Sequence, residues 1–331
     1  MTSAAEPPFR KVLVAGATGF IGRALVPALL ARGYSVRACA RRVHGALGRA
    51  GLEMVGCDLL DPRTLGPALA GVDAAYYLVH SLGGKSFREL DRRAASAFVD
   101  AAAVAGLRRI VYLGGVAPRR TPSEHLASRL EVGRILRDGP VPAVELRAAM
   151  IVGVGSASWQ IVRDLAMRLP AMVLPSWLSS RLSPIALEDV VRALVSALEI
   201  PLPASAYYDI PGPDTLTGKE ILEHVAALEG RKIPSVSLPW LTPRLSAVWL
   251  RLVTRADFAL ARELVFGLTD DLLPESRRYW DLVGYRPRLS FDAAARAALD
   301  EEQRGRAGAA GRLGRIEEAL VRRIGRRLPA D

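Results

Sequence analysis

The chain contains few of the residues that build disulfide frameworks or metal sites. Its two cysteines, Cys39 and Cys57, belong to neither a CxxC pair nor a Cys/His cluster. Two cysteines cannot form a disulfide framework, and their scarcity fits a reducing cytosol. The four histidines are dispersed along the chain, and neither a G-x-S-x-G elbow nor an H-E-x-x-H motif occurs. The sequence therefore indicates no metal site and no hydrolase of those two classes.

Long apolar runs are absent as well. No stretch reaches the ~18 consecutive apolar residues that a membrane-spanning helix needs. The opening residues MTSAAEPP lack a positively charged leader region, and glycines interrupt the apolar run that follows. We therefore expect a cytoplasmic protein whose contact with a membrane is at most peripheral.

Lysine is scarce, although the formal net charge is +11. Arginine carries nearly all of the positive charge. Such an excess indicates an anionic partner, for example a phosphorylated cofactor, nucleic acid or a lipid surface, or else reflects a biased composition. Because no basic stripe with interleaved aromatic residues occurs, we expect no nucleic-acid partner.

The chain does have a regular alternation of short apolar strands and helical patterns from residue 11 to about residue 210. Such alternation is typical of a parallel sheet covered on both faces. Between the fourth and fifth strands, apolar residues recur at helical spacing from Phe87 to Ala105, and Gly106 ends the helix. The sequence thus predicts an α/β protein with a Rossmann-type doubly wound parallel sheet. The candidate strands are residues 11–16, 34–40, 53–57, 74–79, 109–115, 143–149 and 206–210.

A glycine-rich turn follows the first strand in VLVAGATGFIGRAL. Gly16 allows a tight turn, Gly19 lets the backbone approach a pyrophosphate, and Gly22 lets the next helix pack against the strand. The backbone amides of residues 18–21 would then meet the diphosphate at the helix N-terminus. We assign these residues to the phosphate site of a dinucleotide: Gly16, Thr18, Gly19, Phe20, Ile21 and Gly22.

The end of the second strand indicates which dinucleotide binds. An NAD site presents an acidic residue there to the ribose, whereas an NADP site presents arginine to the added phosphate. Arg41 and Arg42 occupy this place, so NADP(H) is preferred and NAD(H) is the alternative; both arginines could also be solvated surface residues. Asp58 could accept a hydrogen bond from the adenine amino group or cap the next turn. The other residues assigned to the cofactor site are Leu59, Leu78 and Val79.

The segment after the sheet predicts a smaller, mainly helical C-terminal lobe. We assign residues 9–210 to a NAD(P)-binding Rossmann domain, of which 154–182 contribute to the lobe, and residues 211–300 to the lobe itself. Helical patterns occur near 217–229, 243–253 and 257–267. Residues 301–331 form a basic tail with helical spacing after Leu313, which could touch anionic lipid, remain solvated or pack against a partner. The last helical segments before residue 300 offer a hydrophobic surface that could meet a second copy of the chain, a lipid or a ligand.

Several motifs together resemble a known family. GATGFIG, GCDLLDP, YYLVHSLG, DRRAASAFVDAAAVAGLRRIVYLGG and SRLEVGRILRDGPVPAVELRAAMIVG resemble the atypical short-chain dehydrogenase/reductases, more narrowly their NmrA-like and epimerase-like NAD(P)H-binding members. The resemblance covers roughly residues 11–235, and VGYRPRLSFDAAARAAL resembles the closing helix of extended members. It implies a Rossmann fold, a nicotinamide cofactor and oxidoreductase or epimerase chemistry.

The catalytic positions of that family carry different residues here. Active members have a serine at the end of the fifth strand and a Tyr-x-x-x-Lys pair on the next helix, which handle the proton as hydride moves. The resemblance places Gly115 at the serine, His125 at the tyrosine and Arg129 at the lysine. Arg129 could hold the nicotinamide ribose but cannot titrate. His125 could shuttle a proton near neutral pH, or it could be a surface residue at a helix N-terminus.

The end of the fourth strand offers further candidates. His80 and Ser81 would face the nicotinamide side of the cleft, because ligands gather beyond the carboxyl ends of the strands. They could replace the missing proton donor, or Ser81 could cap a turn while His80 lies beside the cofactor without reacting. Lys85 is a third candidate in the same segment.

Two functional hypotheses follow. The first is an NADP(H)-binding oxidoreductase, a reductase or an epimerase-like enzyme, that acts on a small molecule through a non-standard site with His80, His125 and Arg129 as catalytic residues. The second is a binding protein without catalysis that senses NADP(H) or serves in the assembly of a complex. The departures at Gly115, His125 and Arg129 favour the second hypothesis, whereas the cleft strands and the second lobe favour the first.

Overall fold

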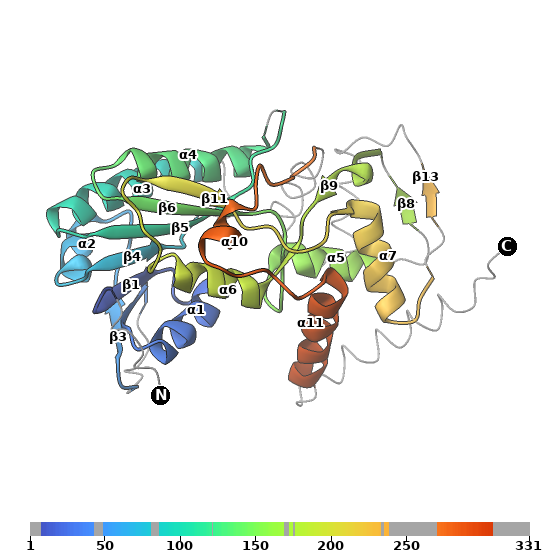
Figure 1. Ribbon diagram of the computed structural model, residues 1–331, viewed down its shortest axis with the longest axis horizontal. Helices are drawn as coiled ribbons and strands as arrows, with labels where there is room; N and C mark the ends of the chain where they lie inside the picture. The colour runs from blue at the N-terminus through green and yellow to red at the C-terminus, as the bar shows by residue number, and fades with distance from the viewer. Residues whose placement is uncertain are drawn as a thin grey trace.

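The computed structural model describes residues 8–42, 49–80, 86–120, 122–168, 172–174, 176–232, 235–237 and 270–306. Its centre is a seven-stranded sheet in the order β11-β6-β5-β4-β1-β2-β3, in which all neighbouring strands run parallel (Figure 1). The order reverses between β1 and β4, which is the topological switch point of a doubly wound sheet. The predicted Rossmann-type fold is therefore confirmed. The strands are β1 (Lys11–Ala15), β2 (Ser35–Ala40), β3 (Leu52–Gly56), β4 (Ala74–Tyr77), β5 (Arg109–Gly115), β6 (Ala143–Ala148) and β11 (Ala206–Asp209).

Side chains alternate between the two faces of this sheet, as the period of a strand requires. Val12 and Val14 of β1 belong to the core that α1 and α6 cover, whereas Leu13 and Ala15 belong to the core that α2, α3 and α4 cover. Figure 1 shows these two groups of helices on opposite sides of the sheet. The covering helices are α1 (Phe20–Ala31), α2 (Pro62–Leu69), α3 (Phe87–Val104), α4 (Glu124–Asp138) and α6 (Leu187–Ser196).

A second lobe has its own apolar core, which includes Trp159, Val225 and Phe291. Helix α7 begins with a capping box, because Thr217 Oγ1 accepts a 3.2 Å hydrogen bond from the Glu220 amide while the Glu220 carboxylate accepts one of 2.7 Å from the Thr217 amide. Within the described residues, the helices of this lobe are α5 (Ala157–Arg168), η1 (Ser176–Ser179), α7 (Gly218–Leu228) and α11 (Phe291–Arg306). Its short strands are β7 (Ile151–Val152), β8 (Met172–Leu174), β9 (Arg181–Leu182), β10 (Ile185–Ala186), β12 (Leu216–Thr217) and β13 (Ser235–Ser237).

The chain returns to the sheet after much of this lobe. In α10 (Arg278–Leu282), the Tyr279 hydroxyl donates a 2.6 Å hydrogen bond to the Ala193 carbonyl, and Trp280 Nε1 donates one of 2.9 Å to the Pro211 carbonyl. Both aromatic rings belong to the core on the α1 and α6 side of the sheet. Residues far along the chain thus complete the packing of the N-terminal half.

A buried charge network joins β6 to α4. The Glu145 side chain is 1% exposed, and its carboxylate accepts hydrogen bonds of 2.9 Å from Arg147 Nε and 2.8 Å from Arg137 Nε. A Cβ at Gly114 or at Gly133 would lie 2.7 or 2.5 Å from Glu145 Oε1, so the two glycines make the space that the carboxylate occupies. The ion pair between Arg137 and Glu145 therefore fixes α4, the helix that carries His125, to strand β6.

Some expectations lie outside the described ranges. The helices expected near 243–253 and 257–267, and the tail beyond residue 306, are among them. The division of the chain at residues 210 and 300 stays a prediction. Within the described part, no helix is both long enough and apolar enough to cross a membrane, and no three or more acidic, histidine or cysteine side chains gather as a metal-binding group.

Candidate functional site

The turn after β1 has the geometry that its glycines predict. Gly16 has a φ of 87°, in the left-handed region, and its carbonyl accepts a 3.0 Å hydrogen bond from the Gly19 amide. A Cβ at Gly16 would lie 2.7 Å from the Leu78 carbonyl oxygen and 3.2 Å from Val79 Cγ2. A Cβ at Gly22 would lie 2.3 Å from the Gly16 carbonyl oxygen. Both positions therefore require glycine, and the turn packs directly against the segment that follows β4.

Helix α1 begins beside this turn with no capping side chain, because its N-cap residue is Gly19. The first backbone amides of a helix have no acceptor within the helix, and they carry the positive end of the helix dipole. The first turn of α1 also contains no acidic residue, and Gly19 is exposed. A diphosphate can approach such a helix end closely and accept its amide hydrogen bonds. The residues present therefore fit the pyrophosphate of a dinucleotide cofactor.

The residues expected to hold the adenosine half lie along the same edge of the sheet. Arg41 and Arg42 follow β2 directly and are exposed. Because β2 is the parallel neighbour of β1, its carboxyl end lies beside the glycine turn. Leu59 is 6% exposed and packs in the core on the α2 and α3 side. The placement leaves both arginines accessible to a phosphate on the ribose, and their role stays a prediction.

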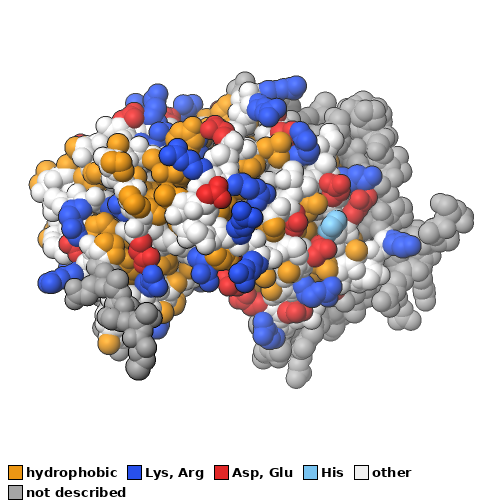
Figure 2. All heavy atoms as spheres, in the orientation of Figure 1, with side chains coloured by type: hydrophobic (Ala, Val, Ile, Leu, Met, Phe, Trp, Pro, Cys, Tyr) orange, Lys and Arg blue, Asp and Glu red, His pale blue; other side chains and the backbone are white. Residues whose placement is uncertain are grey.

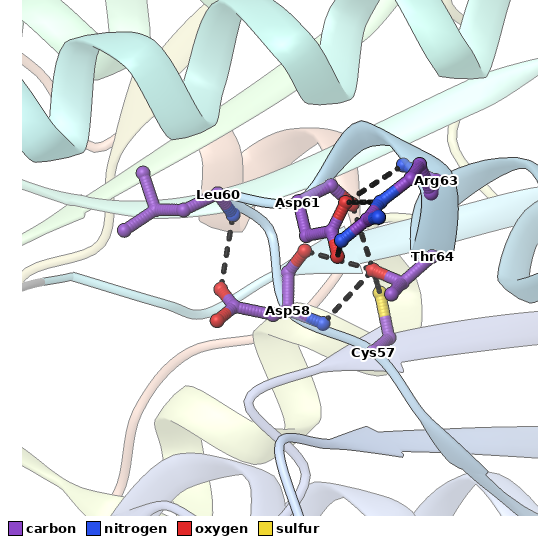
Figure 3. Close-up of polar contacts among 6 residues, drawn as sticks. All are labelled: Cys57, Asp58, Leu60, Asp61, Arg63 and Thr64. Carbon is purple, nitrogen blue, oxygen red and sulfur yellow. Dashed lines mark hydrogen bonds and ion pairs between the residues drawn. The ribbon is translucent and has the colours of Figure 1, made fainter.

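Asp58 follows β3 and forms a tight turn of its own (Figure 3). Its Oδ1 accepts a 3.0 Å hydrogen bond from the Leu60 amide, and its own amide donates a 3.0 Å hydrogen bond to Thr64 Oγ1. The cap of α2 is Asp61, which accepts a 3.1 Å hydrogen bond from the Arg63 amide. Asp58 thus stabilises a turn, which is the second of the two roles that the sequence indicated for it. The first role, a hydrogen bond from the adenine amino group, stays a prediction.

An apolar cavity of about 270 Å³ adjoins the glycine turn. It begins at the carboxyl edge of β4 and β5 and extends between α5 and α7 of the second lobe. Arg41, Arg42, Asp58 and Leu59 do not line it. Six of the predicted site residues do: Phe20, Ile21, Leu78, His80, His125 and Arg129.

Two histidines and an arginine meet at the sheet end of the cavity. The ring centroids of His80 and His125 are 5.9 Å apart, in an edge-to-face arrangement. Arg129 NH2 donates a 2.8 Å hydrogen bond to the Leu113 carbonyl, and the Tyr112 hydroxyl donates one of 3.0 Å to the Arg129 carbonyl. These two contacts fix α4 to β5. The interpretation of His125 as a plain surface residue is therefore wrong, because its half-buried side chain lines the cavity.

Surrounding protein atoms lower the pKa of both imidazoles. Desolvation, followed by the positive charge of Arg129, lowers the pKa of His125 to about 4. Desolvation, then Arg129 and His125, lowers the pKa of His80 to about 3, even though its side chain remains accessible from the cleft. Both rings are therefore neutral at pH 7. A neutral imidazole carries one N–H donor and one acceptor nitrogen, so the pair can hydrogen-bond a carbonyl oxygen without adding charge.

The position that the resemblance aligns with the serine is Gly115, which carries no hydroxyl. A Cβ at Gly115 would lie 2.7 Å from Leu126 Cδ1 and 3.7 Å from Arg129 Nε, so a side chain there would require the Leu126 side chain to shift.

Sequence reasoning missed several residues of the cavity. Ser156 and Ser158 line it, with their hydroxyl oxygens 3.1 Å apart, and so does Tyr112 on β5. The available signal for the two serines was their position at the start of α5, whereas Tyr112 lies in the middle of β5 and gave no such signal. Ser81 and Lys85, which the sequence also offered, lie outside the described residues.

The comparisons with known proteins agree with this geometry. Residues 16–166 match a protein family described as NAD(P)H-binding. A ceramide reductase of Caulobacter vibrioides is 29% identical over 233 residues, which are 69% of this chain and 73% of that protein. A sterol demethylase protein B of Methylococcus capsulatus is 37% identical over 128 residues, but the match covers only 34% of this chain and 38% of that protein.

Solved structures share the fold. One of them is a UDP-glucuronic acid 4-epimerase from Bacillus cereus in complex with NAD, which has a TM-score of 0.68 and 16% identity and covers 89% of this chain and 99% of that chain. At such low identity the likeness concerns the fold alone. Together, the family match and the reductase relative confirm the predicted resemblance to NAD(P)H-binding proteins with reductases among them, and the solved structure of an epimerase confirms the fold.

Proposed function

Because the chain resembles NAD(P)H-binding oxidoreductases and epimerases, we propose that it is an NADP(H)-dependent reductase of small carbonyl compounds. One observation carries this proposal. The uncapped helix end after Gly19 and the paired imidazoles of His80 and His125 open onto neighbouring parts of one edge of the sheet, at its topological switch point. Ligands of doubly wound sheets bind at this point. The Caulobacter relative, whose name describes a reduction, supports the direction of the reaction.

The side chains at the sheet end of the cavity have different roles in this reaction: the two histidines donate hydrogen bonds and a proton, and Arg129 positions the reactants. A bound nicotinamide cofactor supplies a hydride to the carbonyl carbon, and the carbonyl oxygen must gain one proton for the alcohol to form. His80 and His125 can donate N–H hydrogen bonds to that oxygen, as a neutral imidazole polarises a carbonyl in other enzymes. The proton comes from one of these N–H groups and is restored by water that enters the cleft. Arg129 stays charged and positions the ribose or the oxygen.

Turnover and binding can be measured together. NADPH fluorescence should report binding to wild type, and NADPH oxidation should follow when aliphatic carbonyls, quinones or enoyl compounds are supplied. We expect His80→Ala and His125→Phe each to lower kcat by roughly 100-fold or more while NADPH still binds, because each removes a proton-handling donor. His224→Ala is the matched control, since His224 pairs with Asp292 outside the cavity and should not change kcat.

The second candidate, a binding protein that senses NADP(H), is favoured by Gly115, which places no hydroxyl at the position that the resemblance aligns with the serine. It predicts tight NADPH binding without oxidation of any substrate. It also predicts that His80→Ala and His125→Phe alter nothing except, at most, the affinity for NADPH. The same experiment therefore separates the two functions.

The preference for NADP(H) rests on Arg41. Arg41→Asp should raise the dissociation constant of NADPH by roughly 10- to 100-fold and leave that of NADH within about threefold, because only NADPH carries the phosphate that the guanidinium would pair with. Isothermal titration calorimetry with both nucleotides measures this. Arg296→Asp on α11 makes the same change of charge on an exposed surface and should affect neither constant. Equal losses for the two nucleotides would remove Arg41 from this role.

A further inference from the structure

The cavity changes character along its length. At the sheet end its lining includes the polar side chains of His80, His125 and Arg129. At the end within the second lobe, most of the described lining consists of apolar side chains from α5, α7 and the segments beside them, and Ser158 near the start of α5 is polar. The apolar side chains include Ile161, Val162, Leu165, Ile221, Leu222 and Leu272. The reacting group of a substrate would therefore lie among polar side chains, and the rest of the substrate would lie among apolar ones.

The apolar end is part of the fold and not a loose surface. Leu165, Leu222 and Leu272 are each at most 9% exposed and belong to the core of the second lobe. Helices α5 and α7 pack against each other and form this wall together. Val162 packs on the edge of this core and remains partly exposed to the cavity. A hydrocarbon group that enters here leaves water without requiring any new polar contact.

The same wall is unsuited to a sugar nucleotide. A nucleotide sugar carries a diphosphate and several hydroxyl groups, and each buried polar group needs a partner. Among the lining residues that the structure describes, Arg129 is the one side chain with a permanent charge, and one of its nitrogens donates to the Leu113 carbonyl. The hydroxyl of Ser156 donates a 2.7 Å hydrogen bond to the Ile151 carbonyl, so it too serves the local fold. The cavity volume, about 270 Å³, is also close to the lower end of ligand pockets, roughly 300 Å³.

We infer that the substrate is an uncharged carbonyl compound with an alkyl or aryl body, whose carbonyl lies beside His80, His125 and Arg129 and whose hydrocarbon part lies against α5 and α7. This inference rests on the proposed function, since it concerns the same cleft, and it names the substrate class. The reaction is then balanced as follows: the carbonyl carbon gains a hydride from NADPH, its oxygen gains a proton, and the products are a secondary or primary alcohol and NADP⁺.

A fluorescent ketone tests the inference directly. Prodan is an uncharged naphthyl ketone whose emission shifts to the blue in apolar surroundings. With the full chain saturated by NADP⁺, which cannot donate a hydride to the ketone, we expect prodan emission to shift, and we expect 2-decanone to displace the dye at a concentration at least tenfold lower than UDP-glucose. Absence of a shift, or displacement by UDP-glucose at an equal or lower concentration, would overturn the inference.

Substitutions in the apolar wall test whether the dye binds in the cavity. Val162→Asp puts a charge into the apolar wall and should weaken prodan binding at least tenfold, whereas Val104→Asp, at a position that is 91% exposed on α3, should leave it unchanged. Val162→Thr keeps the volume and adds one hydroxyl, so it should weaken binding by a smaller factor even if the aspartate variant does not fold. Unchanged binding in Val162→Thr and in folded Val162→Asp would place the dye elsewhere and overturn the inference.

The failure of the inference and that of the proposed function have different signatures. NADPH affinity is measured by fluorescence in separate samples that contain no dye. If NADPH binds and is oxidised by a polar carbonyl compound while prodan emission stays unshifted, the reductase proposal stands and the substrate class is wrong. If prodan binds as expected, with 2-decanone competing, while no nicotinamide nucleotide binds, the apolar ligand class stands and the proposed function is wrong.

Discussion

Glu145→Ala should lower the free energy of unfolding by about 3–5 kcal/mol, because removing one partner of a buried ion pair leaves an uncompensated charge. The Glu145 carboxylate is 1% exposed and bonds to two arginines, and the Arg147 side chain is itself 8% exposed. Without the carboxylate, the Arg147 guanidinium would remain buried with no anionic partner, next to the empty space that Glu145 had filled between Gly114 and Gly133. Urea unfolding followed by circular dichroism measures the change.

A surface pair provides the control for this prediction. Glu89 and Arg92 form an ion pair on α3 in which both side chains are about half exposed. Exposed pairs contribute roughly 0.2–1 kcal/mol, so Glu89→Ala should have at most this effect. If the two variants lost the same small amount of stability, water would have to reach Arg147 in the folded protein, and the network would not hold α4 to the sheet.

Gly22→Ala should weaken NADPH binding by roughly 100-fold, equivalent to about 2.7 kcal/mol. The added Cβ would lie 2.3 Å from the Gly16 carbonyl oxygen and 2.6 Å from the Ala17 Cα, and both are backbone atoms that cannot rotate away. The start of α1 would have to move off the turn, and the amides that meet the diphosphate would move with it. Overpacking of this kind should also cost about 1–3 kcal/mol of stability. Calorimetric titration with NADPH below the unfolding transition measures the first effect.

Ala103→Val is the control for this substitution, because Ala103 is exposed on α3 and its added methyl groups would face solvent. Stability should therefore change by at most about 1 kcal/mol, and NADPH affinity should not change. Wild-type affinity in Gly22→Ala would contradict the assignment of this turn to the cofactor.

The sheet and the phosphate turn were predictable because they depend on local patterns. The alternation of Val12 and Val14 with Leu13 and Ala15 reads directly as a strand buried on both faces, and the glycine spacing encodes the turn. The predicted strands therefore match β1 to β6 and β11 to within a few residues. Local pattern contains most of the information that a parallel sheet requires.

The cavity could not be predicted in the same way. Val162 and Leu222 lie on helices that are far apart in the sequence, and only the packing of α5 on α7 makes them walls of one space. His125 shows the same limit, since its burial comes from the approach of α4 to the strand edge and not from its neighbours in the chain. The charge of Glu145 also gave no sign of burial, because the space for it is made by glycines on β5 and α4.

The late return of the chain through α10 has a consequence for biosynthesis. Tyr279 and Trp280 complete the apolar layer under the sheet, yet the ribosome adds them after all the strands of that sheet. A nascent chain that ends soon after Asp209 must therefore expose part of this layer to water, in a form prone to association with other chains. The apolar layer of the N-terminal half is therefore completed only after residue 280 has left the ribosome.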